Sequence, residues 1–166
     1  MNIELQKLLL CRYPKFLRKS ADMRPFDERG FECQDGWFEM IDQLCSACED
    51  EIEDLIAKGL DKSSWPRVSQ IKEKFGSLRF RATGEVSSEL RQKFSGAERA
   101  SLLTCESCGK PGRLRRKNGI RTYCDNCEAE LDAGVLASTR TTVNSSFTAY
   151  MQQRKLVQTV LELREG

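Results

Sequence analysis

The stretch CESCGKPGRLRRKNGIRTYCDNC, residues 105–127, holds two pairs of cysteines and decides the local fold around it. Cys105 and Cys108 form the first pair, and Cys124 and Cys127 form the second. A two-residue spacer lets both thiolates of a pair point at one ion, and two pairs complete a tetrahedron. The spacing between the pairs lies within the range of four-cysteine zinc sites. The sequence therefore predicts one Zn²⁺ ion bound by these four residues.

This predicted site is structural and not catalytic, because four cysteine ligands leave no open position for a substrate or a water molecule. Two alternatives use the same residues. One is a set of four unliganded buried thiols, and the other is an iron–sulfur cluster.

The residues between the two pairs predict the geometry of a small module. Asn118-Gly119 is the strongest two-residue hairpin signal and would return the second pair to the first. Gly109 permits a tight turn directly after the first pair, and a helix is expected over residues 128–136. The order of knuckle, hairpin, knuckle and helix predicts a treble-clef-like module over residues 105–137. A plain zinc ribbon is the alternative.

Six basic residues crowd onto this predicted hairpin. Arginine suits phosphate and carboxylate because its fork donates two parallel hydrogen bonds. The segment's only aromatic is Tyr123, so it offers no stacking platform for bases. Three interpretations stay open: binding of nucleic acid, binding of an acidic protein surface, and a solvated or internally paired face. The candidate anion-binding residues are Lys110, Arg113, Arg115, Arg116, Lys117 and Arg121.

Outside the module, the clearest helix is predicted over residues 36–59. Its apolar residues recur at helical spacing, and its acidic residues gather on the opposite side. That acidic side is either a solvated face or a docking surface. Asp35 is expected to cap the start of the helix, and Gly59 to end it. The apolar set is Trp37, Ile41, Leu44, Cys48, Ile52 and Leu55; the acidic set is Glu39, Asp42, Glu49, Asp50, Glu53 and Asp54.

Two further elements complete the predicted core. Leu78, Phe80 and Ala82 alternate with polar residues, the pattern of a half-buried strand, so residues 68–83 predict a β-hairpin that turns at Gly76. A helix over residues 87–103 would present its apolar residues to this hairpin. A short helix over residues 2–19, broken near Pro14, and a loop over residues 20–36 precede them. The apolar face of the 87–103 helix consists of Leu90, Phe94, Ala97 and Ser101.

The fold class predicted is therefore α+β, with helices packed on a small antiparallel hairpin. We expect a core domain over residues 1–104, the zinc module over 105–137, and a linker with a C-terminal helix over 138–166. That last helix, at 147–163, carries two apolar stripes, which favour either contact with the core and with a second copy of the chain, or deep packing. The length of 166 residues fits one domain with an appended module.

The remaining cysteines resemble a second ligand set but predict burial. Cys45 and Cys48 share the two-residue spacing, and Cys11 and Cys33 could complete the group. Cys48 falls on the apolar face of the predicted helix and Cys45 at its edge, where cysteine behaves as a small hydrophobe. We expect no metal at these four residues.

Composition excludes much of enzymology. The chain contains no histidine, which excludes Ser-His-Asp and Cys-His catalysis and any histidine-bound metal. The net charge of +2 conceals an acidic block over residues 31–61 and a basic block over 105–127, so each could suit a partner of opposite charge or pair with the other. No apolar run approaches the roughly 18 residues of a membrane span. Eight cysteines indicate metal or burial in a reducing compartment, so we expect a cytoplasmic protein.

Three stretches taken together resemble a group of small uncharacterised proteins encoded by bacteriophages and prophages. They are ECQDGWF at 32–38, IKEKFGSLRF at 71–80 and CESCGKPGRL at 105–114, and the similarity covers roughly residues 3–135. In that group the second knuckle often ends in histidine where this chain has Cys127, and both residue types bind zinc. The resemblance carries no activity. It implies a phage setting and the cytoplasm of a bacterial host.

We therefore expect a non-enzymatic zinc-containing binding protein. The resemblance favours a phage-type accessory protein that engages a host protein or nucleoprotein, and inhibition of a defence system is one role it suggests. The alternative is a zinc-dependent nucleic-acid-binding or regulatory protein that uses residues 110–121. An enzyme using the carboxylates of residues 31–61 is the weakest hypothesis, because no motif supports it.

Overall fold

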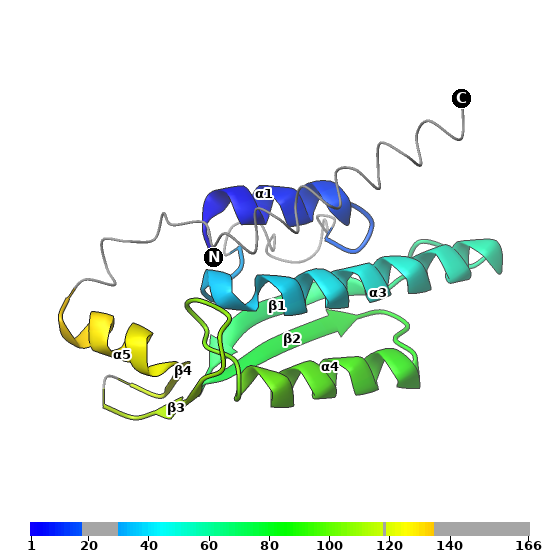
Figure 1. Ribbon diagram of the computed structural model, residues 1–166. Helices are drawn as coiled ribbons and strands as arrows, with labels where there is room; N and C mark the ends of the chain where they lie inside the picture. Colours follow the sequence, from blue (N-terminus) through cyan, green and yellow to red (C-terminus); the bar gives the residue numbers. More distant parts are fainter. Residues whose placement is uncertain (18–29, 118, 135–166) are drawn as a thin grey trace, which may run out of the picture.

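The computed structural model describes residues 1–17, 30–117 and 119–134, and these form an α+β fold (Figure 1). Helix α3 lies alongside a long β-hairpin, α4 lies beside the same hairpin, and a second, shorter hairpin sits at its turn end. The helical elements are α1 (Ile3–Arg12), the 3₁₀ turn η1 (Asp35–Trp37), α3 (Phe38–Ala57), α4 (Ser88–Ser101) and α5 (Asp125–Asp132). The strands are β1 (Arg67–Lys74), β2 (Ser77–Thr83), β3 (Arg113–Arg115) and β4 (Arg121–Tyr123).

The long hairpin forms where the alternating pattern predicts it. Strands β1 and β2 pair antiparallel, and Ile71 lies opposite Phe80, both 1% exposed. A bulge between Val68 and Gln70 shifts the register, which turns Val68 and Ile71 to the same buried face although they are three positions apart. The turn is made by Phe75 and Gly76, with φ of 55° and 80°. Two positive φ values are the signature of a type I′ turn.

Helix α3 follows its predicted apolar stripe but begins differently from the prediction. Gly59, at φ 75°, ends it, and the N–H of Leu60 donates to the carbonyl of Leu55 at 3.0 Å, so Gly59 terminates the helix as predicted. The prediction that Asp35 caps the start is wrong. The N-cap is Trp37, without a side-chain hydrogen bond. Asp35 instead accepts hydrogen bonds from Asn2, at 2.6 Å from its backbone N–H and 2.8 Å from its side-chain amide.

The core lies between α1, α3, α4 and the inner face of the long hairpin. Phe80 stacks on Phe16 at a ring-centroid distance of 5.7 Å and contacts Phe94 at 4.9 Å. Cys45 and Cys48 are fully buried among these apolar side chains, as the helical pattern predicts. The residues expected on the inner face of the helix at 87–103, Leu90, Phe94, Ala97 and Ser101, are all buried in α4.

The acidic side of α3 is not wholly solvated, because Asp42 on that side is buried. Its side chain is 1% exposed, and its Oδ1 accepts hydrogen bonds from Arg12 at 2.9 Å and from the Tyr13 hydroxyl at 2.8 Å. Glu49 also turns inward to accept the backbone N–H groups of Lys15 and Phe16. This side of α3 therefore anchors the segment that follows α1.

The linker and helix predicted over residues 138–166 lie outside the described residues, and so does Asn118 of the predicted turn. Helix α1 ends at Arg12, before the predicted break near Pro14. No helix among the described residues is long and apolar enough to cross a membrane.

Candidate metal centre

The four cysteines at 105, 108, 124 and 127 come from two short turns that the smaller hairpin brings together. The first pair follows α4, and its turn closes when the N–H of Gly109, at φ 74°, donates to the carbonyl of Cys105 at 2.9 Å. Strands β3 and β4 then pair antiparallel and return the chain. The second pair begins α5, where Cys124 is the N-cap and its sulfur accepts the N–H of Cys127 at 3.5 Å. The predicted helix at 128–136 therefore starts earlier, at Asp125, and ends at Asp132.

These turns place four sulfur atoms within 4.8 Å of one another. Cys108 Sγ and Cys124 Sγ are 3.6 Å apart. Sulfur ligands at about 2.3 Å from a tetrahedral zinc ion lie about 3.8 Å from each other, so the cluster has the dimensions of such a site. Cys105 and Cys127 are buried, and the other two are half-buried. The residues fit one metal ion with four thiolate ligands.

The pKa values of the thiols depend on the balance of burial and hydrogen bonding. Burial raises the pKa of Cys108 to about 11, and burial together with the neighbouring Cys105 raises that of Cys127. At Cys124 burial also opposes ionisation, but hydrogen bonds from the Cys127 backbone and the neighbouring thiols outweigh it and lower the pKa. A bound cation reverses the burial penalty, because thiolates are then neutralised by the metal. Metal binding at this cluster should therefore release protons.

No comparable cluster forms from the other cysteines. Among the described residues, the four-cysteine set is the only group of three or more potential ligands whose atoms converge. Cys11 is exposed on α1, whereas Cys33, Cys45 and Cys48 are buried. Burial raises the pKa of Cys33 to about 12 and raises those of Cys45 and Cys48 further. These buried thiols behave as small apolar side chains.

Most of the basic residues predicted to bind anions pair with acidic neighbours of the same chain, largely at the surface. Arg115 is the most enclosed, with a side chain 12% exposed that pairs with Asp125 and, at 2.5 Å, with Glu128. Its hydrogen bond to Asp125 lowers the pKa of that carboxyl group. Lys110 and Arg116 are exposed and make no ion pair with the described residues. The other pairs are Arg113 with Asp125 (2.9 Å), Lys117 with Asp132 (2.7 Å), and Arg121 with Glu73 (2.5 Å) and Glu106 (3.4 Å).

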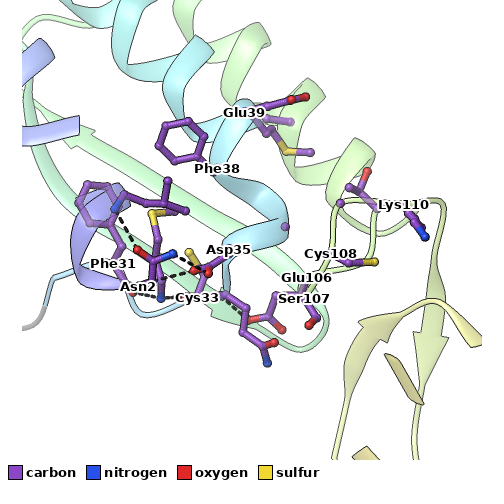
Figure 2. A pocket seen from close by; sticks show the side chains of 18 of the residues that line it. Asn2, Phe31, Cys33, Asp35, Phe38, Glu39, Glu106, Ser107, Cys108 and Lys110 are labelled. Carbon is purple, nitrogen blue, oxygen red and sulfur yellow. Dashed lines mark hydrogen bonds between the residues drawn. The ribbon is translucent and has the colours of Figure 1, made fainter. Parts of the chain in front are cut away.

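The first knuckle lies beside the segment before α3, and Figure 2 shows Glu106 and Ser107 near Asp35. The N–H of Gly36 donates to the carbonyl of Glu106 at 2.8 Å, and a Cβ built on Gly36 would lie 2.3 Å from the Cys105 carbonyl oxygen. Glu106 is 1% exposed, and its carboxylate accepts the N–H of Gln34 at 3.1 Å. Burial raises the pKa of Glu106 in spite of the nearby Arg121. No local sequence pattern predicts the roles of Gly36 and Glu106, because each acts through a contact about seventy positions away along the chain.

A cleft of about 2040 Å³ opens beside this junction (Figure 2). It runs from the N-terminal residues past the start of α3 to the first knuckle, with Asn2, Asp35, Glu106 and Lys110 among its polar lining. Comparison with protein-family models, curated proteins and solved structures finds no match to this chain. The function is therefore inferred from the geometry.

Proposed function

We propose that this chain is a non-enzymatic binding protein whose small module is held by one structural zinc ion. The observation that carries the proposal is the convergence of the four sulfur atoms within 4.8 Å. Soft thiolate ligands in a tetrahedral set favour zinc or an iron–sulfur cluster. The chain order of knuckle, β3–β4 hairpin, knuckle and α5 is that of a treble clef, which supports zinc over a cluster.

A closed four-thiolate site supplies stability and not reactivity. Structural zinc contributes on the order of 10–16 kcal/mol of binding free energy in small zinc modules. Here that free energy would act on a junction in which Gly36 and Gln34 bond to Glu106 of the first knuckle. The absence of histidine removes the commonest acid–base group. These features support a scaffold that presents a surface to a partner.

The resemblance to phage-encoded proteins supports a host protein or nucleoprotein in the bacterial cytoplasm as the partner. The pairing of Arg113, Arg115, Lys117 and Arg121 with acidic neighbours favours the internally paired interpretation for most of the small hairpin. Binding through residues 110–121 alone would rest chiefly on Lys110 and Arg116.

Elemental analysis of protein expressed with supplementary zinc tests the metal assignment. We expect about one equivalent of zinc, no visible absorption from iron and sulfide, and loss of the metal in Cys105→Ser. Cys45→Ser is the matched control, because it removes a buried thiol outside the cluster and should keep the full metal content. Less than about half an equivalent of zinc would contradict the proposal, and a metal content that falls in Cys45→Ser would reveal a second site.

A further inference from the structure

The outer face of the long hairpin carries a row of cations that the metal centre does not use. Residues alternate between the two faces of a strand, so Lys72, Arg79 and Arg81, each next to a buried residue of the pair, point outward. Lys74 lies two positions after Lys72 and shares its face. Lys72 lies directly opposite Arg79 across the pair. We call the set Lys72, Lys74, Arg79 and Arg81 the basic strand face.

The charges of the basic strand face are incompletely balanced by the described residues. Like charges placed directly opposite each other on a strand pair are destabilising, as Lys72 and Arg79 are here. The Nε of Arg79 is buried without a hydrogen-bond partner in the described part of the chain. Arg81 has a weak contact with Glu98 at 3.6 Å. The backbones of Glu32 and Lys72 form an isolated parallel β-bridge, but no ion pair joins the two side chains. This arrangement favours an anionic ligand.

Phe75 stands at the end of this face in a conformation that its residue type disfavours. It occupies the first central position of the turn at φ 55°, where a type I′ turn prefers asparagine or glycine. The residue is nevertheless 66% exposed, with Lys74 Nζ 5.5 Å from the centroid of the Phe75 ring. A strained backbone that displays an aromatic ring to solvent is a feature found at functional sites.

The zinc module braces the turn that displays Phe75. The Thr122 hydroxyl of β4 donates to the carbonyl of Gly76 at 2.7 Å. Glu73 accepts the N–H of Gly76 at 2.7 Å and pairs through its other oxygen with Arg121. A Cβ on Gly76 would lie 2.2 Å from the Leu114 side chain. The ring is therefore held on a fixed support, so little conformational entropy is lost when a ligand binds.

We propose that the basic strand face and Phe75 together bind single-stranded nucleic acid without sequence preference. Alternate residues of a strand stand about 6.6 Å apart, so Lys72 and Lys74 can follow a sugar–phosphate backbone while Phe75 stacks on a base. A single strand exposes the π-faces of its bases, whereas a duplex hides them. An acidic protein would satisfy the cations but gives no reason for a planar ring in a strained turn. The inference rests on the proposed function only in that zinc braces the turn.

Fluorescence anisotropy with a labelled oligothymidylate, over a series of salt concentrations, measures the binding directly. About three phosphate contacts predict a slope of log K against log salt of roughly −2, from about −0.7 per contact for single strands. Lys72→Gln with Arg79→Gln should weaken binding about tenfold or more and flatten that slope. Lys7→Gln with Lys58→Gln removes the same charge from distant, exposed positions on α1 and after α3, and should leave affinity nearly unchanged. Glu32→Gln should tighten binding.

Phe75→Asn separates a binding role from a structural one. Asparagine suits the turn, so the melting temperature should rise, while loss of the ring should weaken binding about fivefold or more. Phe75→Trp should restore the affinity. Zinc content, measured on each variant, should stay constant, so a failed metal assignment and a failed binding assignment are distinguishable.

Wild-type affinity in Phe75→Asn or in the double glutamine variant would overturn the proposal. Binding to an aspartate-rich peptide without binding to the oligonucleotide would overturn it in favour of an acidic protein partner.

Discussion

At the scale of single residues, Gly36 shows why one part of the site could not be predicted. The pattern around it predicted a helix start, and Trp37 does enter the core, fully buried. The requirement for glycine comes instead from the first knuckle, whose Cys105 and Glu106 carbonyl oxygens leave no space for a Cβ. A contact between segments this far apart in sequence has no local pattern. The four clustered cysteines are the opposite case, because their spacing alone identifies them.

Gly36→Ala should therefore destabilise the protein strongly. The added methyl would approach backbone atoms at 2.3–2.7 Å, and backbone atoms cannot move aside as a flexible side chain can. We expect a loss of about 3 kcal/mol in the free energy of unfolding, measured by urea denaturation. Gly96→Ala is the control, since nothing lies within 4 Å of its Cβ on α4, and it should gain about 0.5–1 kcal/mol. Equal stability of the two variants would show that the backbone of the first knuckle can move aside for the added methyl group, and would contradict this prediction.

Thiol reactivity should divide the cysteines by their environment. Cys11 is exposed, so a thiol-reactive reagent at pH 8 should modify it quickly in the folded zinc protein. Cys33 should resist, because burial raises its pKa to about 12, and Cys45 and Cys48 should resist for the same reason. At a temperature well below the midpoint of the zinc-free protein, a zinc chelator should add only the four cysteines of the cluster to the reactive set. Mass spectrometry of the labelled peptides checks this, and fast modification of Cys45 in the folded protein would contradict the buried assignment.

At the scale of elements, helices and the long hairpin were predictable, and their partners were not. The apolar spacing of α3 and α4 and the alternation in β2 identify which residues are buried. Helical periodicity also places Asp42 on the polar side, yet α1 and the residues after it cover that position. Periodicity describes one helix in isolation, so it cannot tell solvent from a neighbouring element that brings its own polar groups.

The link between α1 and α3 should depend on Asp42. Its carboxylate is 1% exposed and accepts hydrogen bonds from Arg12 and from the Tyr13 hydroxyl, so Asp42→Asn removes a buried negative charge beside the Arg12 side chain, which is only 19% exposed. Breaking a buried pair costs about 3–5 kcal/mol, and the partial exposure of Arg12 reduces this to about 2 kcal/mol. Urea denaturation measures the change. Asp54→Asn, on the exposed side of α3, is the control and should stay within about 0.5 kcal/mol of wild type.

At the scale of the whole molecule, the predicted boundary between residues 104 and 105 is crossed by several close contacts. Trp37 Nε1 donates to the Thr104 carbonyl at 2.9 Å, just at the boundary. Beyond it, Thr122 bonds to Gly76 and the Gln34 side chain bonds to the Tyr123 hydroxyl at 2.5 Å. Sequence spacing identified the module because metal ligands are local in sequence. It could not show that the module and the core share an interface, because that interface is built from groups with no common pattern.

Removal of zinc should therefore weaken the core as well as the module. Hydrogen bonds from Thr122 to Gly76 and from Gln34 to Tyr123 join the module to the core, so we expect one cooperative unfolding transition. In a Trp65→Phe background, the fluorescence of Trp37 reports the junction, and far-ultraviolet circular dichroism reports chiefly α3 and α4. With zinc bound, the two probes should give coincident curves. A chelator should move both midpoints down together, by about 10 °C or more, because a ligand bound only to the folded state stabilises all of it. Without a chelator, Cys105→Ser should already have the lower melting midpoint, and adding the chelator should not change it.

A fluorescence midpoint that falls while the circular dichroism signal of the helices melts at its original temperature would contradict this coupling. It would instead support a core of residues 1–104 that folds without the module.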